Sequence, residues 1–461
     1  MFSLLLDVAD ERPLREWGVR HVNDQRFFVN RRDVLRYGGV AAVVGASGIP
    51  LRAFGAPDPK FEIPSVTLKW GSLPFTNHGW HILAARKGFL ADVGITMEGG
   101  QGTNTPRIVN ERQVIPQLEN GELDVSGHYF GGIVQALDRL QNARVFLAYG
   151  YAQGRSILCS PSSSYKTTKE LLDEGLSWEE ATKQAIGQMR GKKFGLLNEP
   201  SARPFSEFAL SLGGLTLDDL EVIPLEDPKT VQLALGGQLD FAAPSGFVQI
   251  YQLGHQAGWK SIIDQPLMMS SMPTDRERLS EFLNYDLVMC TADYLNDNRD
   301  TILRVSSALY RTIDYMFGAQ QMEALSEYAP FINSVNGSNI EPDAIKYIFE
   351  ELDPFIPFEA QQEIWEDANS PIYYRNIVDP QIKKLIAEGV LPDQEYDLES
   401  VFAAKGIWKE LQELKIQTEE LKAKFDPATT GDRKEFYEAA LRHYERRNYL
   451  DSARLMQNAI G

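Results

Sequence analysis

The chain has 461 residues, of which 43% are hydrophobic and 24% are charged, a balance typical of a soluble globular protein. Its length exceeds that of one average domain and allows two lobes with a sizeable core. The formal net charge of −18 at pH 7 argues against nucleic acid and anionic membranes as partners, because both bind to basic surfaces. Two cysteines, Cys159 and Cys290, are too few for a disulfide framework or a cysteine-rich zinc site.

Residues 1–56 have the features of a twin-arginine signal segment. Arg31 and Arg32 are followed by a spacer, two apolar residues and a base, and then by an uncharged stretch over residues 37–50. The sequence Ala-Phe-Gly-Ala at 53–56 suits a signal peptidase, and the stretch is too short to remain as a membrane anchor. The alternative is a buried N-terminal helix, which the glycines of this stretch disfavour. With no cysteine near the cleavage region, we expect a freely diffusing periplasmic protein, exported already folded.

From residue 66 onward, short apolar strands alternate with helical stretches, which predicts an α/β fold with a mainly parallel sheet. In the first series we predict strands at 66–70, 95–97 and 123–125, and helices at 79–89 and 114–118. In the second series we predict strands at 193–197 and 221–224 on either side of a helix at 204–212.

A short repeat indicates that the two series form two similar lobes. Gly-Glu-Leu-Asp at 121–124 recurs as Gly-Gln-Leu-Asp at 237–240, each time after an apolar helix. Two further apolar runs, 156–160 and 287–290, are predicted to be strands that cross between the lobes. We therefore expect lobe 1 to comprise residues 60–152 plus 286–400 and lobe 2 residues 153–285, joined by a hinge around a ligand cleft.

The last segment, residues 405–461, differs in character and is predicted to be a helical hairpin. An amphipathic charged helix at 408–425 is followed by a Pro-Ala-Thr-Thr-Gly break and a second helix at 432–460. The hairpin either packs on lobe 1 or provides a homodimer or partner contact. The stripe available for such a contact consists of Leu411, Leu414, Ile416 and Leu421.

Segments of both series resemble the periplasmic solute-binding proteins of ABC importers, in the group that binds nitrate, sulfonates, taurine and thiamine-pyrimidine precursors. The resemblance rests on residues 68–70 and 84–95 in the first series, and on 189–193, 213–215 and 237–240 in the second. It spans about residues 65–320, extends more weakly to 400 and does not cover the C-terminal hairpin. It implies a bilobal periplasmic-binding-protein architecture, two α/β lobes joined by two crossing strands, with an ABC permease and ATPase on separate chains. The chain has no P-loop of its own, as a receptor component would require.

Ligands of open α/β sheets lie beyond the carboxyl ends of the strands, where loops and helix N-termini converge. Four predicted loops meet this rule, at residues 74–80, 126–131, 198–203 and 242–247. From these loops and the crossover between the lobes we select as ligand-binding candidates Phe75, Asn77, His78, Trp80, His128, Tyr129, Phe130, Arg155, Glu199, Ser201, Arg203 and Ser245.

The chemistry of these candidates indicates a small organic anion or a flat heterocycle as the ligand. Asn77 and Ser201 are able to cap helices whose N–H groups would face a bound oxygen. The aromatic residues offer flat apolar walls, or else pack within the lobes. Arg203 and Arg155 are suited to pair bidentately with a sulfonate or carboxylate. Residues 76–78 also resemble the opening loop of the pyrimidine-precursor binders.

Three of the six histidines, His78, His81 and His128, fall on the candidate loops or beside them. Together with Glu199 they offer possible metal ligands, but no metal-spacing motif is present, and hydrogen bonding to a ligand or plain packing are the alternatives. We therefore expect no metal and no cofactor.

The sequence favours a binding protein and disfavours an enzyme. Some relatives of the pyrimidine-precursor binders build a pyrimidine, using pyridoxal phosphate on a lysine and a cysteine-rich segment, whereas this chain has His128 and an isolated Cys290. A Gly-x-Ser-x-Gly elbow is also lacking. We expect the extracytoplasmic component of an ABC importer. The alternatives are a pyrimidine-synthase-like enzyme, or a sensory or adaptor protein that acts through the C-terminal hairpin.

The two cysteines lie on the two predicted crossing strands. They are either buried thiols at the hinge or, if the strands are neighbours in an oxidising compartment, a disulfide that stiffens the hinge.

Overall fold

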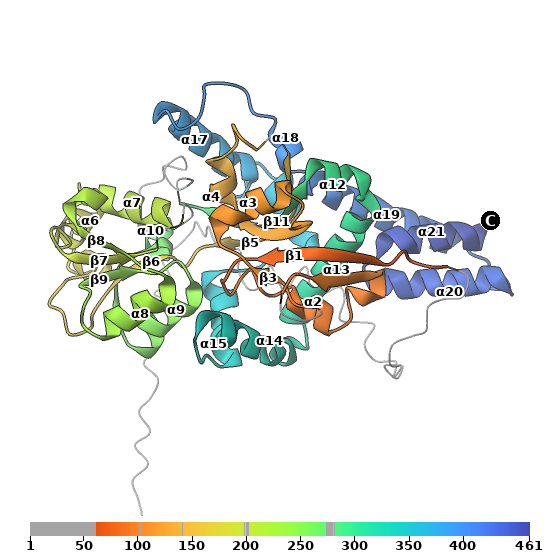
Figure 1. Cartoon of the computed structure of the whole chain (residues 1–461), viewed down its shortest axis with the longest axis horizontal. Coiled ribbons are helices and arrows are strands. Elements are labelled where there is room, and N and C mark those ends of the chain that lie inside the picture. Colours follow the sequence, from red (N-terminus) through yellow and green to blue (C-terminus); the bar gives the residue numbers. More distant parts are fainter. Residues whose placement is uncertain are drawn as a thin grey trace, which may run out of the picture.

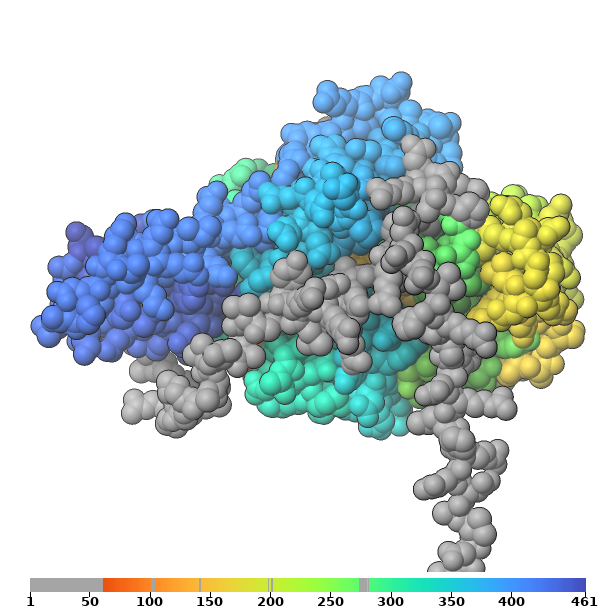
Figure 2. Space-filling view, turned by 180° about the vertical axis from the view of Figure 1, so that it is seen from behind, coloured from red at the N-terminus to blue at the C-terminus, as the bar shows by residue number. Residues whose placement is uncertain are grey.

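The computed structural model describes residues 61–100, 104–140, 142–197, 199, 202–272, 280 and 282–461. Two β-sheets, each covered by helices, form two lobes that lie side by side (Figure 1). The C-terminal helices and the second lobe lie at opposite ends of the molecule (Figure 2). The predicted bilobal α/β architecture is therefore confirmed. The predicted signal segment, residues 1–56, lies outside the described residues.

The first sheet is built from two distant parts of the chain. Its strands are β1 (Val66–Ser72), β2 (Ile95–Glu98), β3 (Arg107–Ile108), β4 (Val125–Tyr129), β5 (Ala143–Ala152) and β11 (Asn284–Thr291). They are arranged in the order β2-β1-β4-β11-β5, with β3 paired to β1 beside this path. β1 runs parallel to β2, β3 and β4, whereas β11 is inserted antiparallel between β4 and β5.

The second sheet comes from one continuous stretch between those two parts. Its strands are β6 (Ser156–Cys159), β7 (Lys193–Leu196), β8 (Glu221–Pro224), β9 (Phe241–Ala243) and β10 (Lys260–Asp264). They are arranged in the order β10-β6-β9-β7-β8, in which β7 is parallel to both its neighbours and β6 is antiparallel to both of its own. The residue limits proposed for the two lobes stay a prediction.

Helices connect and cover the strands of both sheets. Those of the first lobe are α2 (Ile82–Arg86), η2 (Ala91–Val93), α3 (Glu111–Glu119), α4 (Phe130–Val134), α12 (Ala292–Asp297), α13 (Arg299–Phe317), α14 (Gln321–Asn336), α15 (Pro342–Tyr347), η5 (Ile348–Leu352), η6 (Phe358–Ala360), α16 (Gln362–Trp365), α17 (Tyr374–Ala387) and α18 (Leu398–Val401). Those of the second are α5 (Thr168–Asp173), α6 (Trp178–Gly187), α7 (Arg203–Leu212), η3 (Leu217–Asp219), α8 (Asp227–Leu235), α9 (Phe247–Tyr251), η4 (Gln252–Gln256) and α10 (Gln265–Ser271). The last three helices are α19 (Ala404–Lys424), α20 (Asp432–Glu445) and α21 (Tyr449–Ile460).

The four-residue repeat adopts the same local structure in both lobes. Each copy joins a helix to a strand, α3 to β4 and α8 to β9, and begins with a glycine in the left-handed region, with φ of 69° and 67°. The aspartate that ends each copy accepts a hydrogen bond from a backbone N–H of the neighbouring strand. Asp124 accepts from Lys69 at 2.8 Å and Asp240 from Lys193 at 3.0 Å. The repeat therefore fixes the same helix–strand turn twice.

Three sequence expectations about individual elements are corrected. The strand predicted at 123–125 begins at Val125 and continues to Tyr129, so most of the loop predicted at 126–131 is part of the first sheet. The helix predicted at 79–89 is confined to α2, and turns surround it. The helix predicted at 432–460 is two helices, because Arg447 adopts a positive φ of 60° between α20 and α21.

The disulfide hypothesis is wrong. Cys159 lies in β6 of the second sheet and Cys290 in β11 of the first, so the two strands are not neighbours, and both thiols are free and buried. Burial also raises the pKa of Cys290 to about 12, which keeps this thiol protonated and unreactive.

Thiol counting tests this placement. Denatured protein that has not been reduced should react with two equivalents of a thiol reagent, and native protein with almost none because both sulfur atoms are buried. Absence of free thiols after denaturation would contradict the structure.

The C-terminal helices are packed into the molecule. α19 lies against β5 and α21, and α21 lies against α13. Leu411 belongs to the core of the first lobe, Leu414 and Leu421 pack against buried residues, and Ile416 is exposed. Most of the apolar stripe therefore serves packing within the chain, and a homodimer contact through the hairpin stays a prediction.

A buried ion pair ties α21 to α13. Arg304 donates two hydrogen bonds to the carboxylate of Asp451, at 2.9 and 2.7 Å, and both side chains are at most 4% exposed. A second pair between the same two helices, Arg454 with Asp300, is exposed. The two pairs join the same helices and differ in burial, and Asp451 also accepts a hydrogen bond from Asn448 Nδ2 at 2.7 Å.

We predict that Asp451→Ala lowers the free energy of unfolding by about 3–5 kcal/mol, because it leaves the guanidinium of Arg304 buried without a counter-charge. The matched control Asp300→Ala should cost at most about 1 kcal/mol, as is usual for an exposed pair. Urea unfolding followed by circular dichroism checks both values. Equal effects of the two substitutions would contradict the role given to burial.

No helix in the described part of the chain combines the length and the apolar character needed to span a membrane.

Candidate functional site

Polar side chains from both lobes meet where the lobes are in contact. We call this group the interlobe cluster, and none of its side chains is more than 4% exposed. Its members are Asn77, His78, Tyr129, Tyr149, Arg155, Asp227, Ser245, Asp286 and Asp353. The lobes also meet through apolar residues, because Phe247, Val248 and Ile250 of α9 join the core of the first lobe.

Asp286 places a carboxyl group in the middle of the first sheet. In β11 it lies opposite Tyr129 of β4 and Gly150 of β5. Its Oδ1 accepts a hydrogen bond from Asn77 Nδ2 at 2.8 Å, and Asn77 Oδ1 accepts one from the Tyr129 hydroxyl at 3.2 Å. Gly150 leaves room for the carboxyl group, because a Cβ atom there would lie 3.0 Å from Asp286 Oδ2. Burial raises the pKa of Asp286 to about 6.

Asp353 brings a second carboxyl group to the first. It directly follows η5, in a segment that runs beside the end of β5, where Gln153 N–H donates to the Leu352 carbonyl at 3.0 Å. Burial, and then the negative charge of Asp286, raise the pKa of Asp353 well above its ordinary value. Asp286 Oδ2 and the carbonyl oxygen of Pro354, the residue after Asp353, both border Gly150, at 3.0 and 3.2 Å from the position of a Cβ atom there. Hydrogen bonding between the two carboxyl groups contributes to both pKa shifts, and such a bond requires one of them to carry a proton.

His78 is a neutral base beside these carboxyl groups. Its Nδ1 lies 2.9 Å from the Tyr149 hydroxyl in a hydrogen bond, and its Nε2 lies 3.7 Å from Asp286 Oδ1. Burial, followed by the charges of His128 and His81, lowers the pKa of His78 well below its ordinary value. At neutral pH this ring therefore adds no positive charge to the cluster.

Arg155 contributes a positive charge from the side of the second lobe. It follows the crossover from β5 and its Nη1 donates to Ser245 Oγ at 3.0 Å. The loop of Ser245 is held by Asp227 of α8, which accepts hydrogen bonds from the N–H groups of Ser245 and Gly246 at 3.1 and 2.5 Å. Within the described part of the chain, Arg155 Nη2 has no hydrogen-bond partner.

Apart from the contact between the two carboxyl groups, further buried polar atoms of the cluster have no hydrogen-bond partner among the described residues. They are Nε2 of His78, Oδ2 of Asp286 and both carboxyl oxygens of Asp353. A proton shared by the two carboxyl groups would pair one oxygen of Asp286 with one oxygen of Asp353 and leave the remaining atoms unpaired. Leaving a buried polar group unpaired costs roughly 1–3 kcal/mol, so a concentration of such groups marks a place where a ligand would supply partners.

Several predicted site residues come together in this cluster. Asn77, His78, Tyr129, Arg155 and Ser245 are members of it. The ring of Phe75 lies beside it, with its centroid 6.4 Å from that of His78 and 5.6 Å from that of Tyr129.

The structure places other candidates in the core of the first lobe. Trp80 packs against Tyr149 and Phe355, and Phe130 packs against Tyr285 and Phe402. Because β4 extends to Tyr129, Phe130 begins a helix within the lobe and does not lie on an open loop. Neither ring is part of the cluster.

His128 turns towards its own backbone. Its Nδ1 lies 2.8 Å from the Tyr129 carbonyl oxygen in a hydrogen bond, and burial lowers its pKa to about 4. Glu199 lies 3.7 Å from Arg112 in a contact between the lobes, and burial raises its pKa. Ser201 lies outside the described residues.

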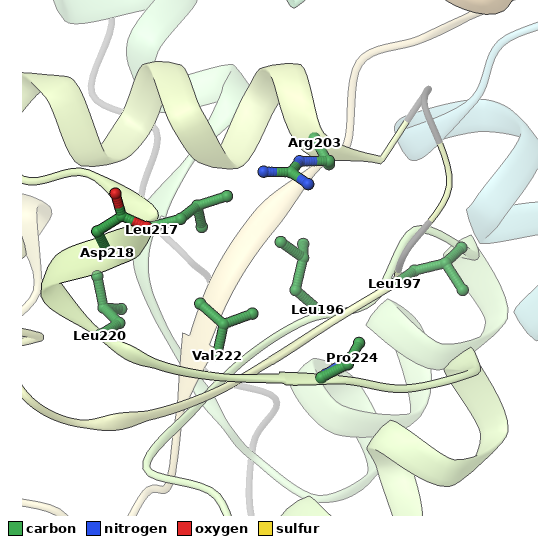
Figure 3. A pocket seen from close by; sticks show the side chains of 8 residues that line it. All are labelled: Leu196, Leu197, Arg203, Leu217, Asp218, Leu220, Val222 and Pro224. Atoms are coloured by element: carbon green, nitrogen blue, oxygen red, sulfur yellow. The ribbon is translucent and has the colours of Figure 1, made fainter.

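Arg203 is on the surface of the second lobe. Its Nε donates to Glu207 at 3.0 Å, and it lines a hollow of about 450 Å³ (Figure 3). The hollow is bordered by Leu196, Leu197, Leu217, Asp218, Leu220, Val222 and Pro224, and Arg203 with Asp218 supplies its charges. The expected convergence of Arg203 with Arg155 is therefore not observed, because α7 presents Arg203 to this outer hollow.

Among the described residues, no group of three or more His, Cys, Asp and Glu side chains is placed to hold a metal ion. His81, which is close to His78 in sequence, stacks on Trp70 with ring centroids 4.8 Å apart.

Sequence reasoning missed the three carboxyl groups of the cluster and Tyr149. Asp286 offered a signal, because a charged residue inside the apolar run of residues 285–290 must be paired or functional when buried. Asp227 and Asp353 offered none, since both lie near other acidic residues in segments that look exposed.

No family model matches the chain, and no curated protein matches it. Solved structures do. The alkanesulfonate-binding protein SsuA from Xanthomonas axonopodis pv. citri, bound to MOPS, has a TM-score of 0.50 at 12% identity, over 74% of this chain and 99% of that one. A protein from Methylobacillus flagellatus KT described as a periplasmic sulfonate-binding protein SsuA has a TM-score of 0.51 at 14% identity, over 77% and 96%.

The fold is that of a periplasmic binding protein. At these identities the likeness shows the fold alone, and at that level it confirms the resemblance to the nitrate, sulfonate and taurine group.

The expectation that the chain is not an enzyme is corrected. The solved structures that resemble it include the desulfurization enzyme DSZB, at a TM-score of 0.45 and 11% identity over 75% of this chain and 99% of that one. A fold by itself does not exclude catalysis.

The packing role of His81 gives a pH prediction. Burial lowers the pKa of His81 to about 3, whereas the unfolded chain binds a proton near pH 6.5. His78 and His128, whose pKa values burial also lowers, lose stability in the same pH range. The contribution of His81 is complete above pH 6.5 and is lost as pH falls below it, by about 2 kcal/mol at pH 5. We predict that His81→Phe, which keeps the stacking on Trp70, removes this loss.

Urea unfolding at pH 7.5 and pH 5.0 measures the difference. The control His255→Phe should change it less, because that ring is only partly buried. A wild-type loss that His81→Phe leaves unchanged would contradict the assignment.

Proposed function

We propose that this protein is the extracytoplasmic solute-binding component of an ABC importer and that its ligand binds at the interlobe cluster. The observation that supports this most is the meeting of unpaired buried polar groups from both lobes, above all Arg155 on one side and Asp286 with Asp353 on the other. A ligand that satisfies groups on both lobes favours the closed arrangement over the open one by its differential contacts.

The periplasmic location and the partners follow from the same proposal. The likeness to SsuA-type structures supports delivery to an ABC permease and ATPase on separate chains, which would recognise the closed form. Of the ligands expected from the sequence, a flat heterocycle suits the cluster better than a simple organic anion, because the two carboxyl groups repel negative charge.

The hinge in this proposal is the crossover before Arg155. Gln265 of the second lobe donates to the Ala152 carbonyl at 2.8 Å, and Gly154 approaches Leu352 so closely that a Cβ atom would lie 2.5 Å from its Cβ. Opening of the lobes would break such contacts beside the crossover. Contacts between the ligand and both lobes would add to them in the closed state and so oppose opening.

A thermal-shift screen of sulfonates, aromatic carboxylates, nitrate and pyrimidines tests the function. We predict that at least one solute raises the melting temperature as its concentration rises above Kd, by an amount equivalent to about 2.7 kcal/mol at one hundred times Kd. Small-angle scattering should show compaction with the same solute.

Two arginine variants locate the site. Arg155→Ala should weaken binding of that solute by about tenfold or more, the usual loss for a hydrogen bond to a charged group. Arg203→Ala, on the outer hollow, should change it less than about twofold. A solute that binds equally well to both variants would place the site elsewhere, and no shift or compaction with any solute would contradict the function.

A further inference from the structure

We infer that the ligand carries a positively charged N–H group that takes the place of the proton shared by Asp286 and Asp353, so that binding releases this proton. The inference rests on the proposed function and names the class of solute that the same site takes. In this inference, the carboxyl pair recognises a planar cation, either an amidine or a protonated aminoheterocycle.

The first reason is the geometry of the pair. Asp286 is held by the hydrogen bond from Asn77, and Asp353 is held by the segment that follows η5. Oδ2 of Asp286 and both carboxyl oxygens of Asp353 have no other hydrogen-bond partner of good geometry among the described residues, although the amide of Asn77 also lies near Asp353. Two adjacent carboxylates with fixed positions match the paired, coplanar N–H groups of an amidinium.

The second reason is the charge of the surroundings. The groups that face the pair are His78 from the loop after β1, Tyr129 of β4, Tyr149 and Tyr151 of β5, Arg155 of the crossover and Tyr328 of α14. Burial lowers the pKa of His78 and raises those of the four tyrosines, so these five groups are neutral at neutral pH. Among these groups only Arg155 adds a charge, and it also faces the carboxyl group of Asp227. Its Nη2 has no hydrogen-bond partner among the described residues and is available to an acceptor atom of the ligand.

The proton balance follows from these charges. Without a ligand, the pair holds one proton and one negative charge, which Arg155 offsets in part because it also faces Asp227. A cation that enters supplies N–H donors to both carboxylates, and the proton on Asp353 leaves for solvent. A sulfonate or carboxylate ligand brings a second negative charge to the pair and has no donor to replace the proton.

The aromatic rings beside the pair fit a planar ligand. Phe75 and Tyr129 lie with ring centroids 5.6 Å apart, adjacent to His78 and the carboxyl group of Asp286. The faces of aromatic rings attract cations, which adds to the preference for a positively charged ligand.

Benzamidine and three isosteric compounds test the inference on the whole protein. Benzamide is neutral, and benzoate and benzenesulfonate are anionic. Isothermal titration in two buffers of different ionisation enthalpy measures the protons released. We expect benzamidine to bind most tightly and to release up to one proton. Below the pKa of the pair, its affinity should increase by up to tenfold for each unit by which the pH is raised.

Substitutions separate the pair from the rest of the site. Asp353→Asn should abolish proton release and the pH dependence of benzamidine affinity above about pH 6, where the remaining Asp286 is ionised. Asp286→Asn leaves Asp353 protonated because of its burial, so this variant should keep the proton release and bind benzamidine more weakly. The control Asp264→Asn removes a half-buried carboxyl group at the N-cap of α10, outside the interlobe cluster, and should leave both the proton release and the affinity unchanged.

The outcomes distinguish the inference from the proposed function. Tight binding of benzoate or benzenesulfonate, or of any anionic solute of the wider screen, with compaction and without proton release would overturn the inference and leave the function intact. Proton release that persists in Asp353→Asn would also overturn it. If no solute binds, the proposed function fails and the inference with it.

Discussion

The burial of two carboxyl groups against each other is the constraint on which the centre of this molecule depends. Neither Asp286 nor Asp353 is exposed, and carboxylates in such a position cannot both ionise without a strong penalty. The structure meets the constraint with a shared proton, the amide of Asn77 and the charge of Arg155 at a distance. Each of these groups comes from a different segment, so the pair is held only when the first sheet, the crossover and the segment after η5 are assembled.

The remainder of the fold positions these segments. The antiparallel insertion of β11 between β4 and β5 places Asp286 beside Tyr129 and Gly150, and the repeated glycine–aspartate turn sets the helix–strand units of both lobes in the same way. The C-terminal helices are joined to α13 by the buried Arg304–Asp451 pair, away from the second lobe. They therefore stabilise the first lobe without contributing to the interlobe cluster.

The chemistry of the cluster is the basis on which we propose a ligand class different from the one expected from the sequence. Arginine, histidine and aromatic residues on predicted loops favoured an organic anion or a flat heterocycle. The carboxyl pair adds negative charge at the centre, the histidines are neutral, and Arg203 lies on an outer hollow. A planar ligand with N–H donors fits this balance. Because one fold serves many functions, the proposed function rests on the cluster and not on the fold alone.

The sequence by itself determined the bilobal α/β architecture, most of the strands and five members of the cluster, because periodicity and the turn motif at 121–124 and 237–240 act locally. It did not determine that residues 126–129 continue a strand, that Phe130 and Trp80 pack in the core, or that Cys159 and Cys290 lie in different sheets. Only the tertiary structure brought Asp353 to Asp286, since their contact depends on strand order and on a segment that pairs with the end of β5. Local sequence patterns indicate secondary-structure propensity and burial. The pairing of residues far apart in the chain depends instead on how the complete sheet packs.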